Sequence, residues 1–146
     1  MKSLPCQEFD ADKLAMKLGV TIPADVSAIN PVMEQIMNQV RGMGCAEGKE
    51  FEVETALREA LANAIIHGCK QDCTKEIQVC IACEQSHGIL IVVRDPGPGF
   101  DPYSIPSPII GHNVFSSHGR GIFLINQLMD EVAFERGGTE IHMRKH

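Results

Sequence analysis

The chain has 146 residues, the length of one ordinary domain with one hydrophobic core. Hydrophobic residues make up 44% and charged residues 22% of the sequence, which excludes a disordered tail or a fibre. The formal net charge is -6 and no cluster of lysine and arginine stands out, which argues against direct binding of nucleic acid.

The first region, residues 1–18, is expected to be an N-terminal extension that is partly helical over 10–18. It contains no apolar run of signal-peptide length. No later segment reaches the roughly 20 apolar residues of a membrane-spanning helix. A cytoplasmic protein is therefore expected, with one domain over 19–146.

The first half of that domain is predicted to hold a short strand and two helices. Proline ends the strand, and apolar residues at helical spacing followed by glycines indicate each helix. The expected elements are a strand over 20–22 and helices over 25–41 and 51–67.

The second half is rich in strand signals, because runs of valine, isoleucine and cysteine are separated by turn sequences. Residues 96–118, rich in proline, glycine and serine, are predicted to form a long loop, a feature that is often functional. Together the elements predict an α+β fold, with a few helices on one face of a mostly antiparallel sheet. The expected elements are strands over 76–84, 89–94, 131–135 and 139–144, and a helix over 121–129.

Glu59, Asn63 and His67 follow one another at intervals of four residues and form a polar stripe along the second predicted helix. A carboxylate and a carboxamide one turn apart suit phosphate chemistry. The carboxylate can accept a proton, and the amide oxygen can bind Mg²⁺. The alternative is an ordinary solvated helix face, with His67 interacting with the dipole at the helix C-terminus.

Asp95 directly follows an apolar strand and opens the sequence DPGPGF. Gly97 and Gly99 allow unusual backbone angles and the close approach of a ligand, while the prolines stiffen the turn. An acid held there can accept a hydrogen bond from a ligand amine, for example the amino group of adenine. The alternative is a plain tight turn, for which Asp-Pro-Gly is a common sequence.

Gly119, Arg120 and Gly121 are predicted to lead into the last helix. A glycine-rich helix start presents free backbone N–H groups and a positive dipole end to a phosphate, and Arg120 adds a guanidinium group. The segment is not a P-loop, because no Gly-Lys-Ser/Thr follows, and it lacks the third glycine of the dinucleotide fingerprint. The alternative is a loop–helix junction that needs flexible glycines.

The order of these motifs is more specific than any one of them. A Glu-x-x-x-Asn helix, a strand ending in Asp-x-Gly-x-Gly-Phe, a long loop and a Gly-x-Gly helix start resemble the GHKL (Bergerat) superfamily of ATP-binding domains. The resemblance extends from about Val20 to the C-terminus. It implies a two-layer α/β sandwich, with a mixed, mostly antiparallel sheet covered on one face by about three helices.

Within this superfamily, the chain is most similar to the anti-sigma factor serine/threonine kinases, through the segments TIPA, EALANAIIHG, DPGPGF and HGRGI. The resemblance implies that Glu59 is the general base and that Asn63 binds Mg²⁺. It implies that Asp95, assisted by Thr139, recognises the adenine amino group of ATP. It further implies an ATP lid over 101–118, an adenine pocket shaped by Gly97 and Gly99, and a phosphate site at Gly119, Arg120 and Gly121.

The implied function is phosphorylation of a serine or threonine in a STAS-type antagonist of an anti-sigma factor, by a kinase that also binds a sigma factor. A homodimer is implied as well. The main alternative is a module that sequesters its partner without catalysis. The presence of Glu59 and Asn63 favours the kinase, since a pure binder needs no base. A third hypothesis is an α+β structural domain that binds no nucleotide.

Cys80 and Cys83 have the C-x-x-C spacing of a zinc site, but they fall within a predicted strand. Side chains three residues apart on a strand point to opposite faces, so one metal ion cannot easily bind both. Cys69 and Cys73 flank a polar turn. Free thiols are therefore expected rather than a structural zinc site.

Overall fold

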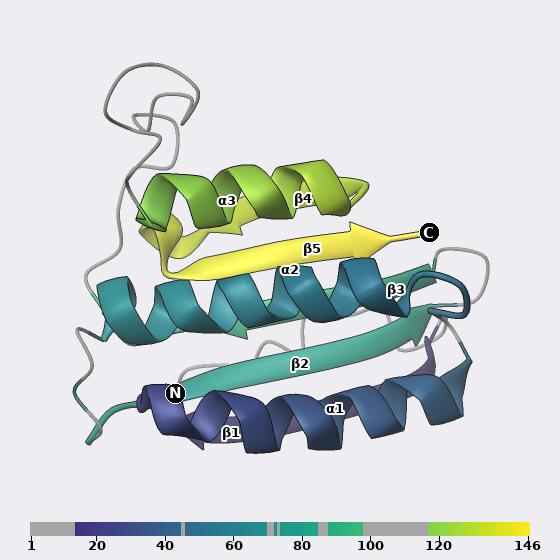
Figure 1. Ribbon diagram of the computed structural model, residues 1–146, viewed down its shortest axis with the longest axis horizontal. Helices are drawn as coiled ribbons and strands as arrows, with labels where there is room; N and C mark the ends of the chain where they lie inside the picture. The colour runs from purple at the N-terminus through teal and green to yellow at the C-terminus, as the bar shows by residue number, and fades with distance from the viewer. Residues whose placement is uncertain (1–13, 45, 70–71, 73, 85–87, 98–116) are drawn as a thin grey trace.

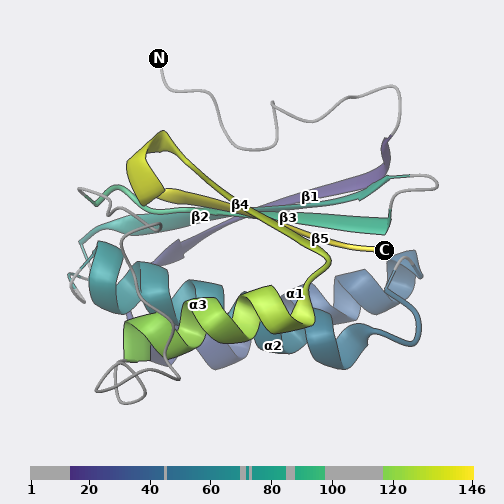
Figure 2. The ribbon, with the colours of Figure 1, turned by 90° about the horizontal axis from the view of Figure 1, so that it is seen from above.

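A computed structural model describes residues 14–44, 46–69, 72, 74–84, 88–97 and 117–146. It has two layers, a five-stranded sheet and three α-helices that cover one face of the sheet (Figure 1 and Figure 2). The strand order is β1-β2-β3-β5-β4, and each pair of neighbours is antiparallel. The elements are β1 (Leu14–Pro23), α1 (Ile29–Met43), α2 (Glu50–Asn63), β2 (Glu76–Glu84), β3 (Gly88–Arg94), α3 (Ser117–Leu128), β4 (Glu131–Glu135) and β5 (Glu140–Lys145).

The expected two-layer α+β fold is confirmed, although the described sheet is entirely antiparallel rather than mixed. No helix in the described ranges combines the length and the apolar character needed to cross a membrane. Helix α1 ends as expected, because Gly44 adopts a left-handed conformation with φ of 74° and donates its N–H to the last carbonyls.

The main core lies between the sheet and the helices. On β3, alternate residues Ile89, Ile91 and Val93 point to the helices, while Leu90 and Val92 belong to a smaller buried cluster on the other face. The helices contribute fully buried side chains to the main core, among them Met33, Ile36, Met37, Leu57 and Leu61. The apolar stripes of α1 and α2 therefore determine which helix faces look at the sheet.

Replacing Leu57 by alanine is expected to lower the free energy of unfolding by about 2–5 kcal/mol, because a fully buried side chain leaves a cavity. Phe51 on the same helix is the matched control, since it is 71% exposed. Its replacement by alanine should change the free energy of unfolding by no more than about 0.5 kcal/mol. Urea denaturation of both variants measures the difference. Equal effects would contradict this assignment of the core.

The N-terminal prediction was wrong in part. Residues 14–18 are not helical but form the first half of β1, which is paired with β2 from Leu14 opposite Glu84 to Pro23 opposite Glu76. Leucine, alanine, methionine and lysine favour helices locally, but pairing with a nine-residue strand overrides that preference. Residues 10–13 lie outside the described ranges. The division into an extension over 1–18 and a domain over 19–146 stays a prediction.

Two of the cysteine expectations were also wrong. Cys80 and Cys83 are disulfide-bonded rather than free. Cys69 is a buried free thiol, as expected, and Cys73 lies outside the described ranges. The argument against shared metal binding holds, because alternation along β2 directs Cys80 and Cys83 to opposite faces.

Candidate functional site

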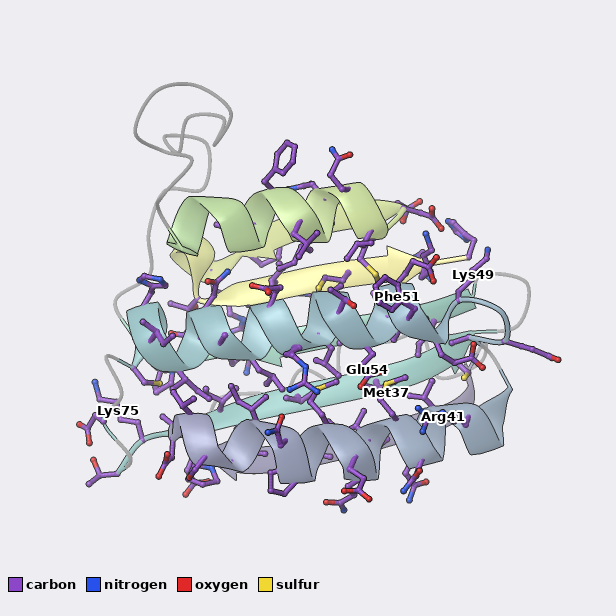
Figure 3. The ribbon with its side chains drawn as sticks, viewed as in Figure 1. Met37, Arg41, Lys49, Phe51, Glu54 and Lys75 are labelled. Atoms are coloured by element: carbon purple, nitrogen blue, oxygen red, sulfur yellow. The ribbon has the colours of Figure 1, made fainter. Side chains whose placement is uncertain are left out.

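Four chain segments meet at one end of the molecule. The C-terminal end of α2, the start of α3, the end of β3 and the turn between β4 and β5 all lie on the left in Figure 1. Lys75 lies at this end, whereas Lys49 lies at the opposite end, where it donates a hydrogen bond to the carbonyl of His146 (Figure 3). The predicted site residues that the structure describes come from these four segments.

Helix α2 carries Glu59 and Asn63 on adjacent turns, and both residues are half-buried. The predicted helix continues past Asn63, but as a π-helical turn over Ala64–Gly68. Single π turns often mark functional sites. Burial lowers the pKa of His67 within this turn. The interaction of His67 with the helix dipole stays a prediction.

Gly121 brings α3 close against the polar stripe of α2. A Cβ atom at Gly121 would lie 2.9 Å from Asn63 Nδ2, 3.1 Å from Asn63 Oδ1 and 3.2 Å from Glu59 Oε2. Any side chain at this position would push the carboxamide or the carboxylate aside. The structure therefore assembles three predicted site residues in one cradle, and it explains the glycine by a close approach rather than by flexibility.

The Gly119-Arg120-Gly121 segment differs from its prediction in one respect. Helix α3 begins at Ser117, so this segment is part of the first turns of the helix and not a loop before it. The first N–H groups of a helix have no partner within it, and here they include those of 117–119. The helix start thus offers the expected donors. The side chain of Arg120 lies outside the described structure, as do Gly99 and residues 101–116 of the predicted lid.

Asp95 is half-buried directly after β3 and is held by backbone hydrogen bonds. Its N–H donates to the carbonyl oxygen of Thr139 at 2.9 Å, and its Oδ1 accepts from the N–H of Gly97 at 2.8 Å. The hydroxyl of Thr139 donates to the carbonyl of Arg136 at 2.8 Å. Asp95, Gly97 and Thr139 are therefore neighbours, as the predicted adenine site requires.

Burial raises the pKa of the Asp95 carboxyl group, although the hydrogen bond from Gly97 opposes the shift. Two neighbours of Asp95 were not anticipated. Cys69, directly after the π turn, is fully buried, and burial together with the Asp95 carboxylate raises the pKa of its thiol. Lys75 stabilises the ionised Asp95 carboxylate. Neither residue belongs to a recognisable motif, so no sequence signal indicated them.

Arg94 and Glu140 are further residues that the motifs did not indicate. They are paired across β3 and β5, and Arg94 Nε lies 2.5 Å from Glu140 Oε2. A charge at the last position of an apolar strand, and an opposite charge directly after Thr139, were the available signals.

These features agree with comparisons to known proteins. A family model described as the histidine kinase-like ATPase domain matches residues 22–145. The anti-sigma F factor of Bacillus subtilis is 25% identical over 132 residues, covering 87% of this chain and 80% of that protein. The anti-sigma F factor of Geobacillus kaustophilus is 28% identical over 133 residues, with the same coverage.

A similar fold occurs in a crystal structure of the RsbU and RsbW domains of a Mycobacterium tuberculosis protein. The TM-score is 0.62 at 17% sequence identity, over 90% of this chain and 32% of that chain. At this identity the likeness concerns the fold alone.

Proposed function

Because the chain belongs to the histidine kinase-like ATPase domain family, we propose that it is an ATP-dependent serine/threonine kinase that acts as an anti-sigma factor. The observation that carries the proposal is the cradle in which Gly121 approaches Glu59 and Asn63. A binding module with no chemistry to perform has no need of a half-buried carboxylate beside the start of a helix that can hold phosphate.

Phosphoryl transfer depends mainly on positioning and on neutralising negative charge. The Glu59 carboxylate would accept the proton of the attacking serine or threonine hydroxyl as the oxygen–phosphorus bond forms. The leaving ADP would keep the electron pair of the broken bond. The N–H groups at the start of α3, with Gly119, Arg120 and Gly121, would hold the phosphate oxygens.

Mg²⁺ is proposed to bind at the same cradle, where the carboxamide oxygen of Asn63 supplies the kind of ligand that this ion prefers. Asn63 would hold the ion, which when bound would neutralise charge on the phosphates. At the other end of the nucleotide, Asp95 would accept a hydrogen bond from the adenine amino group. Thr139, Gly97 and Gly99 would shape that pocket.

The partners are proposed from the relatives and from the motifs. The relatives carry the name anti-sigma F factor, which supports a sigma factor as one partner. A STAS-type antagonist would be the phosphorylated substrate, and the active form would be a homodimer. The proposed cellular location is the cytoplasm, where a sigma factor acts.

The proposal is tested in two steps with the full chain. Calorimetric titration with Mg²⁺-ATP should give saturable binding, and labelled ATP should then transfer its γ-phosphate to a STAS-domain protein encoded beside the gene. Binding without transfer to any such protein would favour the sequestering module. Absence of binding at millimolar ATP would rule out both nucleotide-dependent functions.

The affinity for ATP should depend on pH through Asp95. The ionised carboxylate is the better acceptor for the adenine amino group, and its pKa is raised above 3.8. As the pH falls through this raised pKa, Asp95 gains a proton and the Kd for ATP should rise, starting at a higher pH than for an exposed aspartate.

Replacing Asp95 by asparagine should weaken ATP binding about 10- to 100-fold at neutral pH, the usual value of a hydrogen bond to a charged group. The ratio of the two Kd values, measured by calorimetry, should approach one as the pH falls, which separates Asp95 from titration of the phosphates. Asp25→Asn is the matched control, because Asp25 is exposed and its pKa is lowered by hydrogen bonds from Ser27. A constant ratio would contradict the assignment.

A further inference from the structure

Glu140, at the start of β5, is a carboxylate that is almost completely buried and has two guanidinium groups and one imidazole as neighbours. Its Oε2 lies 2.5 Å from Arg94 Nε and 3.3 Å from Arg136 Nε, and its Oε1 lies 2.6 Å from His142 Nε2. The Glu140 side chain is 0% exposed and that of Arg94 is 9% exposed. Burying such charges is costly unless each is paired, so the cluster needs an explanation.

The cluster lies on the sheet face away from the helices, because its neighbours Ile141 and Val93 point into the main core. It is therefore not part of the cradle formed by Glu59, Asn63 and Gly121. It lies at the last register pair of the β3–β5 ladder, Arg94 with Glu140.

That pair is adjacent to Asp95 and Thr139, the residues proposed to recognise adenine. Asp95 follows Arg94 in the chain, and Thr139 precedes Glu140. The hydrogen bond from the Asp95 N–H to the Thr139 carbonyl extends the ladder by one step. The Arg94–Glu140 ion pair thus holds the two chain segments together at the residues adjacent to Asp95 and Thr139.

Arg136 ties the turn before Thr139 to the same carboxylate. It is the one non-glycine residue with positive φ, 54°, in the part of the chain that the structure describes. This left-handed conformation is unfavourable for arginine. Among the contacts that hold it, its carbonyl accepts from the Thr139 hydroxyl at 2.8 Å, and its guanidinium lies against Glu140.

We infer that Glu140 is a positioning residue for adenine recognition, which it supports by holding Arg94 and Arg136 and thereby the Asp95–Thr139 contact. This inference rests on the proposed function of Asp95. Glu140 is not proposed to touch the nucleotide. The proposed phosphate site is formed by α2 and α3, and Glu140 takes no part in it. Its loss should therefore affect recognition of the base more than binding of the phosphates.

ATP and GTP distinguish these effects, because guanine carries a carbonyl oxygen where adenine carries the amino group. A well-placed Asp95 carboxylate attracts the amino group and repels the carbonyl oxygen. In Glu140→Gln, the Kd for Mg²⁺-ATP should rise about tenfold, while the Kd for Mg²⁺-GTP should stay the same or fall. A purely structural role would weaken both nucleotides equally.

Amide hydrogen exchange in the nucleotide-free protein tests the positioning itself. In Glu140→Gln, the Asp95 amide should exchange about tenfold faster, because its hydrogen bond to Thr139 opens more often. The amide of Asp130, which donates to the Arg144 carbonyl at 2.9 Å at the other end of β5, should keep its rate.

Glu131→Gln is the matched control, because it removes an ion pair of 3.3 Å with Arg144, which joins β4 to β5 at the end of β5 far from Glu140. It should leave the ATP:GTP ratio and the Asp95 exchange rate unchanged. Should Glu140→Gln fail to fold, Arg136→Met offers a milder test, since it keeps the buried Arg94–Glu140 pair. It should change both readouts in the same direction.

An unchanged Asp95 exchange rate, or an equal loss of affinity for both nucleotides, would overturn the inference. If the wild-type protein binds no ATP but Asp95 exchanges faster in Glu140→Gln, the proposed function fails, while the positioning of Asp95 by Glu140 is supported.

Discussion

Replacing Glu59 by alanine is expected to slow phosphoryl transfer by about 10²- to 10⁴-fold, the usual contribution of a general base. The Kd for ATP should change little, because the base acts on the substrate hydroxyl and not on the nucleotide. Single-turnover transfer of labelled phosphate from ATP to the STAS-type partner, alongside calorimetric titration with ATP, measures the two quantities separately.

Glu54→Ala is the matched control for this variant. Glu54 lies on the same helix, its side chain is 39% exposed, and its ion pair with Arg58 spans 3.7 Å. Exposed pairs of this kind contribute little to stability, so both transfer and binding should stay at the wild-type level. Normal phosphoryl transfer by Glu59→Ala would remove Glu59 from the role of base and leave the sequestering module as the better hypothesis.

Replacing Gly121 by alanine should lower phosphoryl transfer by about 100-fold, because small displacements of reacting groups have effects of this size. The new methyl group would lie too close to Asn63 and Glu59, and their side-chain ends can move aside more easily than the helix backbone. Alanine favours a helix more than glycine does, so Tm should stay the same or rise slightly. The combination of normal stability and low activity is the expected signature.

Gly42→Ala in α1 isolates the helix-propensity effect, because a Cβ atom at Gly42 would meet nothing within 4 Å. It should change Tm in the same way as Gly121→Ala and leave the transfer rate unaltered. Thermal unfolding and single-turnover transfer of both variants are the measurements. Wild-type activity of Gly121→Ala would show that the close approach of α3 to α2 has no role in catalysis.

Much of the fold was predictable because its signals are local. The apolar periodicity of α1 and α2 and the short apolar runs of β2 and β3 are properties of a few neighbouring residues. The residues of β1 from Leu14 to Leu18 carry no such signal, since their composition favours a helix and only pairing with β2 makes them a strand. Helix α3 begins four residues before its predicted start, because Gly119 and Gly121 disfavour a helix locally.

The candidate site was predictable as a set of motifs but not as an arrangement. Glu59, Asn63, Asp95 and Gly121 could be named from their spacing and their resemblance to a family, while their roles remain proposals. Cys69, Lys75 and Glu140 belong to no motif. The tertiary structure brings Cys69 and Lys75 near Asp95, and it pairs Glu140 with Arg94. Burial and charge pairing depend on residues far apart in the chain, so no local pattern reports them.

The sequence by itself therefore determined the secondary structure of the main elements, the family and the identity of the proposed nucleotide-binding residues. Only the tertiary structure decided why Gly121 must be glycine and why Glu140 can be buried. The physical reason is that both depend on contacts between segments far apart in sequence: α3 approaches α2 too closely for a side chain, and β3 and β5 bring opposite charges together away from water.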